Sequence, residues 1–171
     1  MYDDLNILIF LKGVLKMFAR NMLEIDIHKD ITGDDYRSLI ELAFHKCDKF
    51  AFVKRRDMMA DEQLAMKFHN ETVKDIENSL IEMKEQKEWE VTKIVDGTAY
   101  VFYYELNEQT KQFLQEKSDS LFGWLTPYLP EDLTFYNGNQ LWLASCSHEN
   151  FFIISDEFKD YEDFMKALKN V

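Results

Sequence analysis

Several residue types that mark common protein classes are scarce in this sequence. Only 5 glycines and 2 prolines occur in 171 residues, so long flexible linkers are not expected. The glycines are also too scattered for a nucleotide-binding fingerprint. The 2 cysteines, Cys47 and Cys146, are too few for a disulfide framework, and we interpret them as thiols within a core. The 4 histidines show no metal-ligand spacing, so we expect no metal site and no cofactor.

Long apolar runs are missing as well. The longest, residues 7–11, is far shorter than the roughly 18 residues that a membrane-spanning helix needs. The N-terminal sequence has acids, Asp3 and Asp4, where a secretory signal has basic residues. We therefore expect a cytoplasmic protein with no membrane partner.

Basic residues are absent between Ser118 and Phe158. Residues 1–60 contain equal numbers of basic and acidic residues, so the whole net charge of −12 comes from residues 61–171. Direct nucleic-acid binding by this part is not expected, because contacts to phosphate need cations. An acidic surface for a basic protein partner is one interpretation, and a surface that only keeps the protein soluble is the other. The candidate residues of the partner surface are Glu131, Asp132, Glu149, Asp156 and Glu157.

What the sequence does contain predicts a folded core. Hydrophobic residues make up 46% of the chain and aromatic residues 15%, which excludes a disordered chain. We expect a single α+β domain over residues 1–171, with helices packed on a mainly antiparallel sheet of about five to six strands. Residues 1–60 form its helical, charge-neutral part, and residues 61–171 form an acidic part with most of the sheet.

The clearest strand pattern lies between Glu131 and Ser155. Residues 133–136, 141–146 and 151–155 are predicted strands separated by polar breaks. Asn137-Gly138 is typical of a two-residue hairpin turn in which both residues have positive φ. We expect a three-strand antiparallel meander at the centre of the fold.

The remaining sequence alternates between helix and strand patterns. We predict helices over residues 5–20, 34–47, 61–79, 107–119 and from Asp156 or Asp160 to 168, and strands over 23–27, 50–53, 91–95 and 98–106. Asp96-Gly97 is expected to join the last two strands as a hairpin. Residues 80–90 fit both a helix and a strand, and we favour the strand. The apolar loop 121–130 is expected to bury Trp124 and Tyr128, and the helix over 5–20 is a candidate homodimer contact.

Lys54-Arg55-Arg56 is the one concentrated basic patch. Three adjacent cations are a candidate site for a phosphate or carboxylate. The alternative is a solvated strand end whose cations pair with acids such as Asp57 or Asp61.

Cys146 and His148 are the arrangement closest to a catalytic one. Positions i and i+2 of an extended strand share a face, so an imidazole could activate the thiol. However, Cys146 alternates with Trp142 and Ala144, which predicts that it faces a core, and His148 falls in the predicted turn. We interpret both residues as structural and favour a protein that is not an enzyme.

Residues 121–149, LFGWLTPYLPEDLTFYNGNQLWLASCSHE, contain the pattern W-L-x-P-x-L-P-E-D-L-x-F, then a glycine turn, then W-L-x-S-x-x-H-E. This pattern resembles one found in small uncharacterised proteins of Bacillus-like bacteria. The match is carried by Trp124, Pro127, Leu129 to Leu133, Phe135, Gly138, Trp142, Leu143, Ser145, His148 and Glu149. The resemblance implies no catalytic residues.

Two kinds of function are consistent with these observations. The first is a non-enzymatic interaction protein, such as an immunity protein, an inhibitor or a phage counter-defence factor, that binds a basic partner through its acidic surface. The second is a small-ligand or anion-binding protein, or an enzyme, whose site no motif marks. A cavity would favour the second function, and a flat acidic patch would favour the first.

Overall fold

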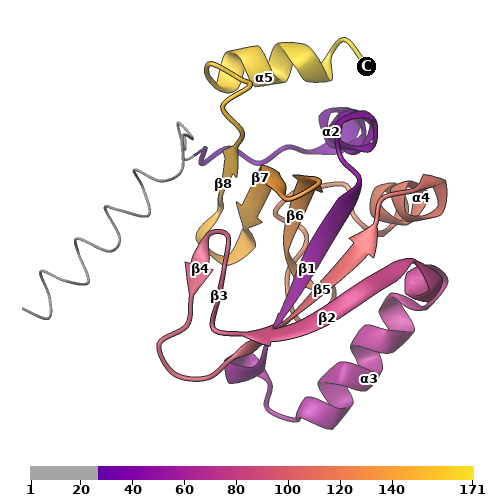
Figure 1. Ribbon diagram of the computed structural model, residues 1–171, viewed down its shortest axis with the longest axis vertical. Helices are drawn as coiled ribbons and strands as arrows, with labels where there is room; N and C mark the ends of the chain where they lie inside the picture. Colours follow the sequence, from indigo (N-terminus) through magenta and orange to yellow (C-terminus); the bar gives the residue numbers. More distant parts are fainter. Residues whose placement is uncertain (1–26) are drawn as a thin grey trace, which may run out of the picture.

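A computed structural model describes residues 27–171 of the protein (Figure 1). The predicted helix over residues 5–20 and its dimer contact lie outside these residues, and so does most of the predicted strand over 23–27. Ile27 exchanges two backbone hydrogen bonds with Phe152, at 2.9 and 3.0 Å.

A six-stranded sheet lies in the middle of the protein, with the strand order β2-β5-β1-β6-β7-β8. Every pair of neighbouring strands is antiparallel. A separate two-stranded sheet pairs β3 with β4. The strands are β1 (Lys49–Arg55), β2 (Leu80–Gln86), β3 (Glu88–Trp89), β4 (Thr92–Lys93), β5 (Ala99–Glu105), β6 (Glu131–Asn137), β7 (Gln140–Cys146) and β8 (Phe151–Ile154). The fold is α+β with a mainly antiparallel sheet, which confirms the prediction.

Helices connect and cover these strands. The α-helices are α2 (Gly33–Lys46), α3 (Glu62–Thr72), α4 (Glu108–Lys117) and α5 (Tyr161–Leu168). Short 3₁₀ helices are η1 (Arg56–Met58), η2 (Lys74–Ser79) and η3 (Ser147–Glu149). In Figure 1, α5, α2 and α4 follow one another around one side of the sheet, and α3 lies below β2.

Alternation along β1 divides the sheet into two faces, because successive strand residues point to opposite sides. We call the face with Phe50 and Phe52 the first face, and the face with Ala51 and Val53 the second face. The first face carries the larger core, to which α2, α4, α5 and η2 contribute. The second face carries a smaller core, which includes Ile94 and is packed against by Trp89.

Trp124 lies within the first-face core, as predicted, and is fully buried. Its ring stacks on Phe52, with 4.6 Å between the ring centroids. Its Nε1 donates a hydrogen bond of 2.8 Å to the Tyr36 hydroxyl, which in turn donates to the Leu114 carbonyl at 2.9 Å. The polar atoms of both buried rings are therefore satisfied.

Most of the predicted elements form. Residues 80–86 are a strand, as favoured over a helix, and the helical pattern before it divides into α3 and η2. Asn107 caps α4 with a reciprocal capping box, and Asp160 caps α5 by accepting from the Asp163 N–H at 2.8 Å. These caps explain why the helices begin where they do.

The two hairpin predictions need correction. Asp96-Gly97 lies between β4 and β5, but these strands do not pair with each other as a hairpin, because β4 pairs with β3 and β5 pairs with β2 and β1. The turn between β6 and β7 is Gly138-Asn139 rather than Asn137-Gly138, since Asn137 still pairs with Gln140. Only Gly138 has positive φ, which is the type II′ pattern.

Two further expectations are only partly correct. The meander is not the centre of the fold, because β6 is one of the two middle strands and β8 lies at an edge. Tyr128 is not buried beside Trp124, since 79% of its surface is exposed.

Candidate functional site

An apolar cavity of about 530 Å³ lies where β1 ends, between α3 and the loop that precedes β6. We call it the Lys54 pocket. Its lining includes Lys54, Met58, Leu64, Phe68, Thr126 and Tyr128. The volume is within the range that small-molecule sites occupy.

The wall of the Lys54 pocket is built from large apolar side chains that are open to solvent. Leu64 is 65% exposed, and Met58, Phe68 and Tyr128 are exposed as well. Leu64 and Phe68 are four residues apart on α3, so they lie on the same face of that helix. A group of exposed apolar side chains around a cavity is typical of a binding site.

The lining holds two cations, Arg55 and Lys54, and Lys54 is only 5% exposed. Its Nζ donates a hydrogen bond of 3.1 Å to Thr126 Oγ1. No acidic side chain among residues 27–171 forms an ion pair with it. Burial lowers the pKa of Lys54, and the charge of Glu131 opposes this change only in part. The ammonium group is thus a buried charge with one neutral partner.

His69, next to Phe68 on α3, is a second unusual polar group of this region. Its ring is buried and packs against Phe102, with 4.3 Å between the ring centroids and a tilt of 33°. Neither ring nitrogen has a hydrogen-bond partner within residues 27–171. Burial, together with the charge of Lys54, lowers the pKa of His69 to about 4. The imidazole is therefore neutral at physiological pH.

The three residues of the predicted anion patch do not act together, because each has a different environment. Arg55 is bound to Asp57 by two hydrogen bonds, at 2.6 and 3.2 Å. Arg56 pairs with Glu62 at 3.0 Å and with Glu85 at 2.6 Å. Pairing with nearby acids, the alternative interpretation, therefore holds for the two arginines, and only Lys54 is left to bind an anion.

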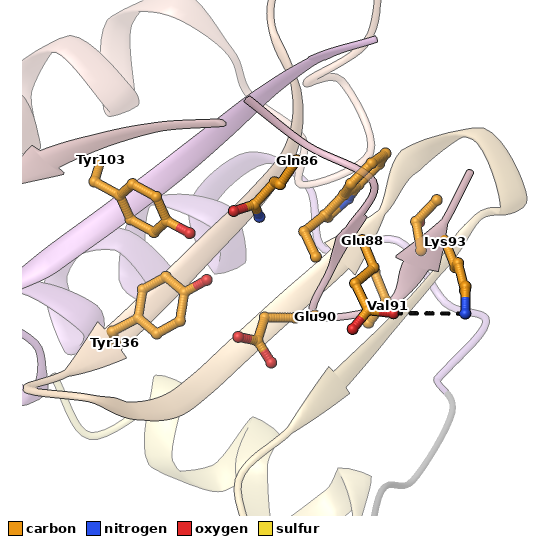
Figure 2. A pocket seen from close by; sticks show the side chains of 9 residues that line it. Gln86, Glu88, Glu90, Val91, Lys93, Tyr103 and Tyr136 are labelled. Carbon is orange, nitrogen blue, oxygen red and sulfur yellow. Dashed lines mark ion pairs between the residues drawn. The ribbon is translucent and has the colours of Figure 1, made fainter. Parts of the chain in front are cut away.

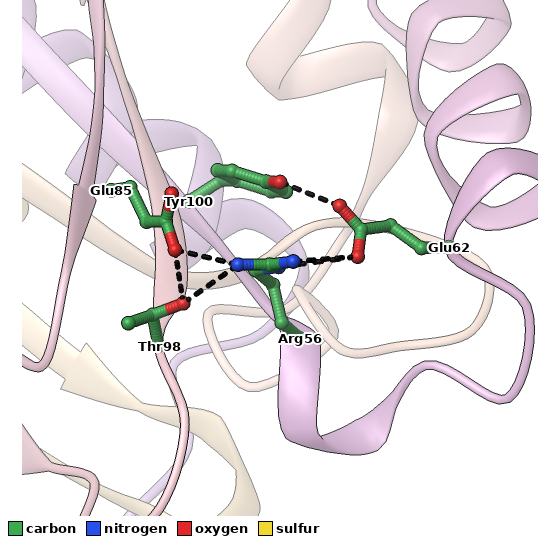
Figure 3. Close-up of polar contacts among 5 residues, drawn as sticks. All are labelled: Arg56, Glu62, Glu85, Thr98 and Tyr100. Carbon is green, nitrogen blue, oxygen red and sulfur yellow. Dashed lines mark hydrogen bonds and ion pairs between the residues drawn. The ribbon is translucent and has the colours of Figure 1, made fainter.

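Arg56 is the centre of a polar cluster beside the Lys54 pocket, which we call the Arg56 cluster (Figure 3). Its other members are Glu62, Glu85, Thr98 and Tyr100. The Tyr100 hydroxyl donates a hydrogen bond of 2.5 Å to Glu62, and the Arg56 guanidinium lies 5.2 Å from the Tyr100 ring centroid. Arg56 also reaches Thr98 and Glu85 of neighbouring segments. The start of α3 is thereby tied to β5 and β2, which holds Leu64 and Phe68 beside the cavity.

Two residues of the predicted acidic surface are not on the surface, so this prediction is wrong for Glu131 and Asp132. Glu131 is fully buried and Asp132 is 2% exposed. Asp132 accepts hydrogen bonds from Trp89 Nε1 at 2.9 Å and from the Ser147 N–H at 3.0 Å. Burial raises the pKa of Asp132 to about 6 in spite of these donors. The β3–β4 hairpin covers the start of β6, which the strand pattern alone could not indicate.

The other three predicted acids are exposed but are not gathered in one place. Glu149 lies in η3, before β8, whereas Asp156 and Glu157 follow β8. Four strand residues separate them by about 13 Å. Glu157 is also engaged with Trp142 Nε1 and with Lys46.

Cys146 and His148 do not form a dyad. The Cys146 sulfur lies 3.7 Å from Thr92 Oγ1, and burial raises the pKa of its thiol. His148 Nε2 lies 3.1 Å from the Glu131 carboxylate. The thiol therefore lacks the activation that a nucleophile needs.

A second cavity, of about 380 Å³, lies on the second face beside the β3–β4 hairpin (Figure 2). We call it the hairpin pocket. Its lining includes Gln86, Trp89, Glu90, Lys93, Tyr103 and Tyr136. In Figure 2 the hydroxyl groups of Tyr103 and Tyr136 point toward the hairpin, and the Glu90 carboxylate points back toward Tyr136.

Sequence reasoning did not single out most residues of these cavities. Leu64 and Phe68 match the helical spacing of a core-facing stripe, and spacing cannot distinguish a buried stripe from the wall of an open cavity. Thr126 and Glu90 carry no local signal, because distant segments bring them to their sites. The one usable signal was Lys54, which follows an apolar strand directly.

Comparisons with known proteins do not place the sequence in a family. No protein-family model matches the sequence, and neither a curated protein nor a solved structure matches it. The resemblance of residues 121–149 to proteins of Bacillus-like bacteria therefore stays a prediction.

Of the helices in residues 27–171, none combines the length and apolar character needed to cross a bilayer. The same residues contain no group of three His, Cys, Asp or Glu side chains arranged to hold a metal ion.

Proposed function

We propose that the protein binds a small amphiphilic anion in the Lys54 pocket. The observation that carries this proposal is the position of the Lys54 ammonium group, which is buried at an apolar cavity with a single neutral hydrogen-bond partner. Leaving a buried charge without a counter-ion is costly. A ligand that supplies the counter-charge removes this cost on binding.

The chemistry of the pocket defines the ligand in two parts. A carboxylate or phosphate head group accepts hydrogen bonds from the lysine ammonium, which has three donors. An apolar body covers the exposed side chains of Leu64, Phe68 and Met58. Each methylene that is buried there contributes about 0.8 kcal/mol. Fatty carboxylates of medium chain length have both parts.

Binding is favoured over catalysis because the polar groups of the pocket are already engaged. The Asp61 side chain caps α3 by accepting from the Leu64 N–H at 3.0 Å. Thr126 Oγ1 accepts from Lys54. Neither group is left to act as a general base or to activate a nucleophile.

The test is a titration of the protein with straight-chain carboxylates from butanoate to dodecanoate, followed by calorimetry and thermal stabilisation. We expect the affinity to rise with chain length until the cavity is filled. Decanol and decylammonium are the matched probes without a negative charge, and both should bind at least about tenfold more weakly than decanoate. Lys54→Met should remove the preference for decanoate over decanol.

The control variant is Lys67→Met, which removes an exposed cation of α3 that does not line the pocket. It should bind decanoate as the native protein does. Equal loss in the Lys54 and Lys67 variants would show unspecific attraction to positive charge. No binding of any chain length would contradict the proposal.

A second candidate function, binding of a basic protein, is favoured by the net charge of −12 and by the exposed positions of Glu149 and Asp156. Its test is capture of a partner at low and at high salt by the native protein and by Glu149→Lys and Asp156→Lys variants. Salt-sensitive capture that both reversals weaken would support this function. If both variants capture the partner as well as the native protein does, this function is contradicted.

A further inference from the structure

The hairpin pocket differs from the Lys54 pocket in charge and in lining. The formal charges of its lining are those of Glu88, Glu90 and Lys93, and Lys49 and Lys84 lie over the rings of its two tyrosines. Lys93 lies near Glu88, with 3.8 Å between Nζ and the carboxylate, on the side of the cavity away from the tyrosines (Figure 2). The Glu90 carboxylate faces the tyrosine side of the cavity, where it is engaged with Tyr136.

Aromatic rings supply much of the remaining lining. Tyr103 and Tyr136 come from β5 and β6, and their ring centroids are 6.1 Å apart. Trp89 adds a third ring from the hairpin, and its Nε1 is held by Asp132. Burial raises the pKa of both tyrosines, and the charge of Glu90 acts in the same direction. Neutral tyrosine rings next to a carboxylate are the environment that attracts organic cations.

The chain itself places a cation on each tyrosine ring. Lys84 Nζ lies 5.2 Å from the centroid of Tyr103, and Lys49 Nζ lies 5.4 Å from that of Tyr136. Both distances are within the range of a cation–π interaction. Each of the two rings therefore already has an ammonium group of this chain beside it.

We propose that the hairpin pocket is a second binding site, which takes the ammonium group of a small organic amine. The Glu90 carboxylate pairs with the ammonium group, and the Tyr103, Tyr136 and Trp89 rings surround its alkyl part. The Tyr103 hydroxyl and the Gln86 side chain accept further hydrogen bonds. This site is independent of the Lys54 pocket, because it lies on the opposite face of the sheet and requires the opposite ligand charge.

The experiment is a titration of the full-length protein with putrescine, monitored by nuclear magnetic resonance of the Trp89 indole N–H. The matched neutral probe is 1,4-butanediol, which has the same length and two hydroxyl groups in place of the amines. We expect putrescine to shift the Trp89 signal and butanediol to leave it unchanged. Equal shifts would overturn the amine assignment in favour of a polyol site.

Three variants locate the site. Glu90→Gln should weaken putrescine binding about tenfold, since it removes a charge-assisted hydrogen bond. Tyr103→Leu should weaken it about threefold to tenfold through the lost ring, whereas Tyr103→Phe should keep most of the affinity. Glu105→Gln, an exposed acid on the same strand outside the cavity, is the control and should bind as the native protein does.

Two results would overturn the proposal. One is an unchanged Trp89 signal at millimolar putrescine. The other is an equal loss of affinity in the Glu90 and Glu105 variants, which would show that putrescine responds only to the overall negative charge. Because Glu90 lies in the turn of the β3–β4 hairpin and Tyr103→Phe changes a single hydroxyl, these variants should fold, as their amide spectra will establish.

Discussion

On the first face of the sheet, three helices and Trp124 cover Phe50, Phe52 and their neighbours, and the single cavity described there is apolar with a cation in its lining. On the second face, a two-stranded hairpin covers a much smaller core, and the cavity beside it is aromatic and acidic. Lys54 lines the first cavity, and the carboxylate that faces the tyrosines of the second cavity is that of Glu90. The difference indicates that the two cavities are suited to ligands of opposite charge.

The comparison also shows where stability and function separate. The aromatic packing of the first face contributes most of the buried apolar surface, which is the dominant favourable term in folding. The buried titratable groups Lys54, His69 and Asp132 make contributions to stability that depend on pH, because the pKa of each is shifted away from its ordinary value. Comparable substitutions on the two faces should therefore change the free energy of unfolding by different amounts.

The largest expected effect is on the two tryptophans. Trp124→Ala should lower the free energy of unfolding by about 3–5 kcal/mol, because it leaves a large cavity beside Phe52. Trp89→Ala should cost about 1–3 kcal/mol, chiefly because Asp132 loses a donor in a buried site. Urea unfolding of both variants measures the difference. An equal loss of unfolding free energy in both variants would contradict the conclusion that the first face carries the larger core.

The pH dependence should show two buried groups that oppose each other. The pKa of His69 is about 4 in the folded protein against 6.5 ordinarily, so the unfolded chain takes up the proton first and stability falls as the pH drops from 6.5 to 4. The pKa of Asp132 is about 6 against 3.8, so the folded protein takes up the proton first and stability rises as the pH drops from 6 to 3.8. Each contribution is roughly 3 kcal/mol, and the two have opposite signs.

Single variants should separate these contributions. Relative to the native protein, His69→Leu should gain stability on acidification from pH 6 to 4, and Asp132→Asn should lose it. Urea unfolding at several pH values gives the slopes, which do not depend on whether the substitution itself costs stability. Slopes parallel to that of the native protein in both variants would show that neither group is titrated as described.

A smaller effect is expected at Lys54. Lys54→Met replaces a buried, unpaired charge by an apolar side chain of similar length, so it should raise the free energy of unfolding by about 1 kcal/mol. The same variant should lose decanoate binding, which is the pattern of a residue kept for function rather than for stability. Thermal unfolding with and without decanoate measures both. A destabilised variant would mean that Lys54 has a structural role.

The smallest effect is expected at Arg56. Its ion pairs with Glu62 and Glu85 are open to solvent, so Arg56→Met should lower the melting temperature only slightly, and the difference should shrink at high salt. Its larger consequence should be a weaker affinity for decanoate, because α3 is less firmly tied to the sheet. A large loss of stability that salt does not reduce would contradict this description of the cluster.

Local sequence patterns were sufficient for much of the fold. Capping residues such as Asn107 and Asp160, and the apolar run over residues 50–53 of β1, act through neighbours in the sequence, so the pattern predicts them well. The β3–β4 hairpin was missed because its residues pack on distant strands through Trp89 and Thr92, and no turn motif marks the reversal at Glu90.

The candidate sites were harder to predict for the same reason. Lys54 and Arg55 are adjacent in the sequence and both line the Lys54 pocket, but Arg55 is bound to Asp57. Three adjacent cations in the sequence therefore do not make one anion site in the fold. Glu131 and Asp132 look like surface acids among many others. Their burial depends on the hairpin and on η3, which come from separate parts of the chain.

A crossed titration tests the central claim, that the two faces bind ligands of opposite charge, most directly. Decanoate and putrescine are each titrated into the native protein, Lys54→Met and Glu90→Gln under one set of conditions. The predicted result is that the Lys54 variant loses only decanoate and the Glu90 variant loses only putrescine. Loss of both ligands in one variant, or of neither in both, would contradict two separate sites.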